Sequence, residues 1–83
     1  MKIKKCLAAI RACSNLNMLL TLPFYRCHSL KGKYKDCYGL DIKHPFRIVI
    51  EPTEQPVPLA KDKSIDTIKV TSVTAIYIGD YHD

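Results

Sequence analysis

Groups that can move protons lie together near the end of the chain. The apolar run VTAIYI (73–78) leads through one glycine to Asp80, Tyr81 and His82. An imidazole changes its charge near neutral pH, so His82 suits acid–base chemistry. The hydroxyl of Tyr81 can donate or position a proton. Because chain termini are often polar and poorly ordered, this tail on its own fits a frayed end equally well.

Basic and aromatic residues alternate along a second segment, YRCHSLKGKYKDCY (25–38). Its basic side chains are Arg26, His28, Lys31, Lys33 and Lys35, and its interleaved phenols are Tyr25, Tyr34 and Tyr38. Cations bind a phosphate backbone and phenol rings stack on unpaired bases, which suits single-stranded RNA. A lysine-rich turn that only keeps the protein soluble is the alternative.

Arg47 lies inside an apolar strand-like run, FRIVI (46–50). Burying an arginine is costly unless it is paired. We therefore expect Arg47 to face a groove, where it can hold phosphate, or to pair with an acid such as Glu51.

These residue types match the needs of RNA cleavage by the 2′-hydroxyl. One group must remove the hydroxyl proton, one must protonate the leaving oxygen, and cations must stabilise the charged phosphorane. No metal is required. We assign the acid or base role to His82, donation or positioning to Tyr81, and the positive field to Lys31 and Arg47.

Two further histidines are alternatives to His82. His28 lies in the basic segment, whereas His44 precedes a proline at a turn and has the context of a structural residue. The histidines are well separated and no carboxylates match their spacing, so no metal site is predicted. The chain also has no G-x-S-x-G, P-loop or dinucleotide-binding motif.

Charge is unevenly distributed along the 83 residues. Residues 1–50 hold ten Lys or Arg against two acidic residues, whereas residues 51–83 hold three against six. A concentrated basic half favours a polyanionic partner, RNA or DNA first and an acidic protein second. The length and the 47% apolar content indicate one small globular domain, 1–83, with a thin core.

The cysteines bear on the cellular compartment. They stand at positions 6, 13, 27 and 37 without a CxxC pair, so a zinc ribbon is not expected. The N-terminal apolar run CLAAI is five residues long and Arg11 follows closely, whereas export requires about 7–15 apolar residues. No run approaches the ~20 apolar residues of a membrane helix. We therefore expect a cytoplasmic protein with reduced, packed cysteines and no membrane partner.

Hydrophobic periodicity predicts the elements that position these groups. Apolar residues recur at helical spacing over 2–13, and Ser14 or Asn15 can cap a second short helix, 15–22, that Pro23 stops. Strand composition follows at 25–30, 37–43, 46–52 and 70–82, with turns at 31–36 and at His44-Pro45 and a proline-rich loop over 53–68. The predicted fold class is α+β, with one or two N-terminal helices on one face of a small antiparallel sheet.

Three motifs together resemble a known family, the HigB-type plasmid-maintenance killer toxins of the RelE/ParE superfamily. They are H-x-L-K-G at 28–32, HPFRIVIEP at 44–52 and the closing D-Y-H at 80–82. The stretch IRACSNLNMLLTLP (10–23) also resembles the second helix of that family. The likeness covers nearly the whole chain.

The resemblance implies a toxin of a type II toxin–antitoxin system. Such a toxin is an endoribonuclease, or mRNA interferase, that inhibits translation by cutting mRNA on the ribosome without a metal or other cofactor. A cognate antitoxin, expected to be of helix-turn-helix type, neutralises it. The candidate residues are His28, Lys31, Arg47, Asp80, Tyr81 and His82. Asp80 would orient a neighbour, and Lys31 and Arg47 would hold phosphate.

One departure from the family pattern bears on activity. Family members begin with a strand and a first helix, whereas this chain opens on what resembles the second helix. We therefore expect an N-terminally truncated RelE-like domain with an exposed sheet edge and core face. The alternative function is a non-catalytic remnant that binds RNA or antitoxin. A small secreted disulfide-bonded protein is the alternative from another class.

Overall fold

Two short helices open the chain in the computed structural model, which describes residues 2–43 and 46–79. Helix α1 spans Lys2–Ala12 and helix α2 spans Leu16–Leu20. Of the two predicted caps, Asn15 is the one used, because its side-chain oxygen accepts a hydrogen bond of 2.9 Å from the Met18 amide. Helix α2 ends before the predicted stop at Pro23, because the Thr21 hydroxyl donates back to the Met18 carbonyl at 2.7 Å.

The strands form an antiparallel sheet in the order β1-β2-β3-β4. Their bounds are His28–Ser29 for β1, Tyr38–Lys43 for β2, Phe46–Pro52 for β3 and Val73–Gly79 for β4. Strand β1 is shorter than predicted, because Arg26 has φ 48°, a left-handed conformation that interrupts the extended chain. Part of the predicted turn 31–36 is the 3₁₀ turn η1, Gly32–Tyr34.

The proline-rich segment is a loop, as predicted, and it is tied to its neighbours. One carboxylate oxygen of Glu54 accepts the amides of Thr71 and Ser72 at 3.0 and 3.1 Å. The Leu16 amide donates to the Val70 carbonyl at 2.8 Å. These amides have no partner within a helix or between strands, so the bonds satisfy them. They also hold residues 70–72 in place just before β4 begins.

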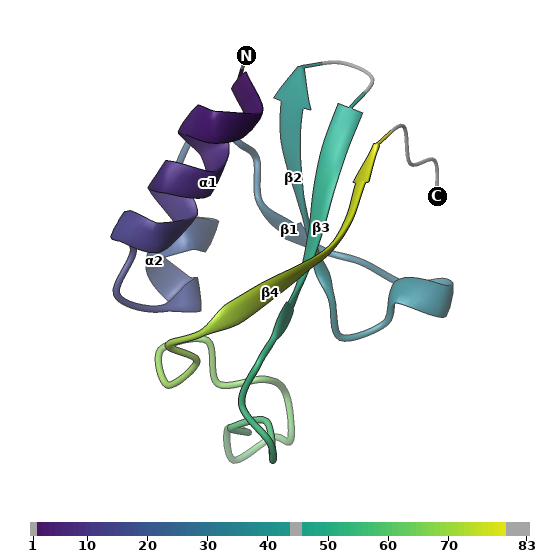
Figure 1. The fold of residues 1–83 in the computed structure, drawn as a ribbon. Coiled ribbons are helices and arrows are strands. Elements are labelled where there is room, and N and C mark those ends of the chain that lie inside the picture. The colour runs from purple at the N-terminus through teal and green to yellow at the C-terminus, as the bar shows by residue number, and fades with distance from the viewer. Residues whose placement is uncertain (1, 44–45, 80–83) are drawn as a thin grey trace.

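The main core is formed by residues of the helices and of one face of the sheet. Figure 1 shows α1 and α2 on the same side of the sheet, while η1 lies on the other side. The buried cluster on the helix side is Cys6, Leu16, Leu19, Cys27, Tyr38, Leu40, Ile48, Ile50 and Val70. A smaller cluster of Leu30, Cys37 and Val49, flanked by Tyr34, lies on the face that the helices leave bare. We call this second face the helix-free face.

These observations establish a small α+β domain, which confirms the coarse fold prediction. The arrangement has two short helices on one side of a four-stranded antiparallel sheet in the described part of the chain. Strand β4 forms an edge of this sheet, and its Ile76 and Ile78 are 40% and 46% exposed. Over residues 2–43 and 46–79, no helix is both long and apolar enough to cross a membrane.

All four cysteines are free thiols, and three of them are buried. Burial raises the pKa of the Cys6 thiol to about 11 and, with smaller contributions from Cys6 and Cys13, that of Cys27 to about 12. The free thiols agree with the predicted reduced, packed cysteines and give no support to the disulfide-bonded alternative.

Thiol reactivity should follow this burial. At pH 8 we expect iodoacetamide to modify the partly exposed Cys13 first. Because only the thiolate attacks, the raised pKa values should slow the reaction by about a hundredfold at Cys6 and about a thousandfold at Cys27, relative to a thiol of ordinary pKa. Mass spectrometry of tryptic peptides after timed quenching measures each rate. In denaturant all four thiols should react together; fewer than four would show that disulfides form after all.

Candidate functional site

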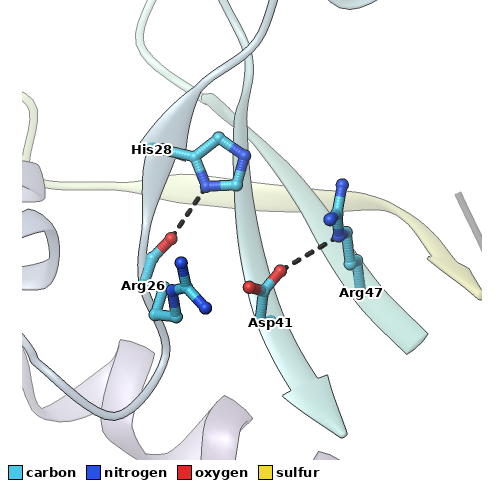
Figure 2. Close-up of polar contacts among 4 residues, drawn as sticks. All are labelled: Arg26, His28, Asp41 and Arg47. Atoms are coloured by element: carbon cyan, nitrogen blue, oxygen red, sulfur yellow. Dashed lines mark hydrogen bonds and ion pairs between the residues drawn. The ribbon is translucent and has the colours of Figure 1, made fainter. Parts of the chain in front are cut away.

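Strand register brings His28, Asp41 and Arg47 onto the helix-free face. Asp41 is directly opposite Arg47, and His28 is directly opposite Gly39. Residues paired across antiparallel strands share a face, as do residues two apart on one strand. The three side chains therefore come from β1, β2 and β3 in turn, as Figure 2 shows. This row, together with Gly39, is the candidate site.

The imidazole of His28 is oriented by the backbone that precedes it. Its Nδ1 lies 2.8 Å from the Arg26 carbonyl oxygen. Since a carbonyl only accepts, Nδ1 carries the proton in this contact, and the neutral ring presents its lone pair at Nε2. The exposed His28 ring can therefore accept a proton from a ligand at Nε2.

Gly39 gives the imidazole its place on the sheet. A Cβ built on Gly39 would lie 3.6 Å from His28 Cε1 and 3.3 Å from a methyl group of Leu30. The bare backbone of β2 thus lets the ring lie over the strand, next to the row of polar groups. A Cβ at this position would meet His28 in ordinary van der Waals contact and would require Leu30 to shift by a few tenths of an ångström.

Arg47 forms an ion pair with an acid, one of the two environments expected for it, and that acid is Asp41 rather than Glu51, the example given. The distance from Arg47 Nε to Asp41 Oδ1 is 3.0 Å, and each side chain is about one-third exposed, 33% and 31%. The contact is an ion pair rather than a well-aligned hydrogen bond, although this oxygen is itself shielded from solvent. In Figure 2 one terminal nitrogen of the guanidinium points away from Asp41. A terminal nitrogen in this position can approach a phosphate while Nε stays with the carboxylate.

The remaining predicted cations lie outside this row, on exposed positions. Lys31, Lys33 and Lys35 are exposed at and beside η1, and Arg26 is exposed just before β1. They can contribute a positive field along a bound backbone, as predicted for phosphate-binding residues.

Two of the three predicted stacking tyrosines do not reach this face. Tyr38 is 7% exposed in the main core, because it alternates with Gly39 and shares a face with Leu40. Burial accordingly raises the pKa of its phenol. Tyr25 is partly buried and packs against the same core. Of these three tyrosines, Tyr34 is the one that lies on the helix-free side. The prediction that all three stack on bases was therefore wrong for Tyr38 and Tyr25.

The closing D-Y-H motif and His44 lie outside the described residues. The last described residue, Gly79, is paired directly with Arg47 on β3. In the sequence, Asp80, Tyr81 and His82 continue from that paired residue. Their assigned roles stay predictions.

Sequence reasoning missed Asp41 and Gly39. The signal for both was the alternation in YGLDIK (38–43), where apolar residues at 38, 40 and 42 require 39 and 41 to share the opposite face. What the alternation does not give is the partner of Asp41. The partner depends on the strand register. A shift between Asp41 and Lys43 changes the pairing of β2 with β3, and with it Asp41 lies opposite Arg47.

Comparisons with known proteins do not add a relative. No family model matches the chain, and neither a curated protein nor a solved structure matches it.

Proposed function

We propose that this protein is an endoribonuclease that cleaves single-stranded RNA without a metal ion. The observation that carries the proposal is the row on the helix-free face, where His28 on β1 and Arg47 on β3 lie on the same side of the sheet with β2 between them. Strand spacings of about 4.8 Å and a rise of about 3.4 Å per residue put the two Cα atoms about 12 Å apart. A single nucleotide linkage fits between two side chains that reach inward across this separation.

The proposed reaction is transfer of the phosphodiester to the neighbouring 2′-oxygen. His28 Nε2 takes the proton from the 2′-hydroxyl as its oxygen attacks phosphorus. The P–O5′ bond breaks, which leaves a 2′,3′-cyclic phosphate on one product and a 5′-hydroxyl on the other. Arg47 stabilises the negative charge that builds on the phosphorane oxygens. No oxidant, reductant or metal enters the balance.

The leaving 5′-oxygen needs a proton, and His82 is the candidate acid from the sequence. Tyr81 is assigned to stacking or proton relay, and Asp80 to orienting one of these two groups. Lys31, Lys33, Lys35 and Arg26 would hold the flanking phosphates, where each contact releases counterions and makes binding sensitive to salt.

The sequence motifs extend the proposal to a biological role. Their resemblance to HigB-type toxins of the RelE superfamily supports a cytoplasmic toxin that cuts mRNA at the ribosome and is restrained by a cognate antitoxin. The basic first half of the chain, with ten Lys or Arg against two acids over residues 1–50, supports a polyanionic substrate.

A second candidate is a non-catalytic module that binds RNA or antitoxin. The Arg47–Asp41 ion pair favours it, since the carboxylate neutralises the cation that the phosphorane needs. Binding can survive on the exposed lysines alone, whereas cleavage cannot proceed without a charge at the phosphorus.

Cleavage of a defined message by the purified chain tests the proposal. We expect the protein to cut a labelled single-stranded mRNA, alone or on stalled ribosomes, at a rate that EDTA leaves unchanged, and to produce 2′,3′-cyclic phosphate ends. Primer extension locates the cuts. A 3′ end that becomes a free hydroxyl only with an enzyme able to remove a cyclic phosphate, and not with a simple phosphomonoesterase, identifies the 2′,3′-cyclic phosphate. Retention of the RNA with no cut in either format would favour the non-catalytic binding module. Cutting that EDTA abolishes would contradict the mechanism.

A further inference from the structure

A tyrosine that the proposed chemistry does not use lies beside Arg47 on the helix-free face. Tyr77 is opposite Val49, whose side chain belongs to the small cluster on that face. A Cβ built on Gly79 would lie 2.8 Å from the Tyr77 hydroxyl oxygen and 3.1 Å from its Cζ. The phenol therefore extends along β4 over the bare backbone of Gly79, which is the residue paired with Arg47.

A second aromatic ring and a cation continue this surface. The ring centroids of Tyr34 and Tyr77 are 6.4 Å apart with an interplanar angle of 37°. The ammonium of Lys33 lies 5.3 Å from the centroid of Tyr34. Tyr77 is 36% exposed. Arg47, Tyr77, Tyr34 and Lys33 thus form a cation–aromatic–aromatic–cation series, which we call the tyrosine platform.

We infer that the tyrosine platform is a subsite for one unpaired nucleobase of single-stranded RNA. A phosphate held by Arg47 places the attached sugar and base over β4, where the Tyr77 ring offers a stacking surface. Arg47 and Lys33 at the two ends attract the phosphates on either side of that nucleotide. Stacking of this kind tolerates every base, because each has a π-face. The inference deepens the proposed function and rests on it.

The test uses a short 2′-deoxy oligonucleotide, which has no 2′-hydroxyl and is not cleaved. One set of oligonucleotides carries an abasic residue at successive positions, and another carries 2-aminopurine there. For the wild-type chain we expect one abasic position to weaken binding by on the order of tenfold and 2-aminopurine at that position to lose fluorescence on binding. In Tyr77→Leu, both effects should disappear. A merely structural Tyr77 would lower thermal stability and leave the abasic difference intact.

Three variants serve as controls. Tyr77→Phe keeps the ring and should keep both effects. Phe24→Leu removes another aromatic ring, 85% exposed outside the site, and should behave as wild type. Gly79→Ala keeps Tyr77 but puts a methyl group where its hydroxyl lies, and should give an intermediate loss.

The outcomes separate this inference from the proposed function. If the wild-type chain cleaves RNA but Tyr77→Leu discriminates the abasic position as well as wild type does, the platform is only the cover of the small cluster and the inference fails alone. If the wild-type chain neither binds nor cleaves RNA, both fail. Loss of the abasic difference in Tyr77→Leu and its retention in Tyr77→Phe support the inference.

Discussion

Replacing His28 with alanine should lower the rate of RNA cleavage by about 10²- to 10⁴-fold, the range for loss of a general base. The Arg26 carbonyl holds Nδ1, so Nε2 is the atom that can take the 2′-hydroxyl proton. The substitution should leave RNA affinity within about a factor of three, since a neutral imidazole adds little to phosphate binding. Single-turnover cleavage of a labelled mRNA measures the chemical step, and filter binding of the uncleavable deoxy analogue measures affinity.

A matched variant separates the base from the contact that orients it. In His28→Asn the side-chain amide can donate to the Arg26 carbonyl in place of Nδ1, but it cannot accept a proton from the substrate. We expect His28→Asn to be as slow as His28→Ala, with melting temperatures close to wild type because the ring is exposed. Wild-type cleavage by either variant would remove His28 from the mechanism and leave the acid–base role to His82.

The elements that the sequence predicted well are those in which periodicity and a local signal agree. For α2 the apolar spacing is reinforced by Asn15, whose side chain caps the helix. For β2 and β3 the β-branched and aromatic composition matches buried strands. For β1 the strand composition was misleading, since Arg26 adopts a left-handed conformation and only His28 and Ser29 pair. A backbone choice of this kind is set by packing around the strand and leaves no periodic trace.

The candidate site was predictable in its residue types but not in its partners. His28 and Arg47 could be identified because each places a polar group in a strand-like run. Their shared face follows from registers across β1, β2 and β3, and a shift of one residue would have put Arg47 into the core. The same sensitivity explains Tyr38. As part of a basic hairpin, Tyr38 was predicted to stack on a base. Because it alternates with Gly39 along β2, its side chain lies on the opposite face of the sheet, in the core.

Removing the guanidinium of Arg47 should lower the cleavage rate by about 10²- to 10³-fold, as loss of one group that stabilises transition-state charge does elsewhere. Arg47→Lys should recover only part of that loss. The arginine can contact Asp41 through Nε and a phosphate through its terminal nitrogens at the same time, whereas a lysine has a single ammonium and cannot reproduce this fork. Cleavage rates and the affinity for the deoxy analogue, measured on the same preparations, separate charge stabilisation from binding.

Asp41→Asn should act in the opposite direction and reveal what the ion pair does. The Asp41 carboxylate offsets part of the charge that Arg47 offers to a phosphate, so neutralising it should tighten RNA binding and steepen its dependence on salt by up to about 0.7 in log–log slope, the value of one full phosphate contact. The cost in folding stability should stay below about 1 kcal/mol, since the pair is one-third exposed. Urea unfolding and a salt titration of binding give the two quantities.

The double variant decides whether Asp41 acts through Arg47. If the carboxylate restrains RNA binding by occupying the guanidinium, the gain from Asp41→Asn must vanish in an Arg47→Ala background, because no guanidinium is left to release. If Asp41 only adds a negative charge to a basic surface, the gain should persist there at the same size. Persistence would also weaken the catalytic proposal, since a phosphate held by the lysines at η1 lies away from His28. Disappearance of the gain would instead place the bound phosphate at Arg47, within the row that holds the candidate base.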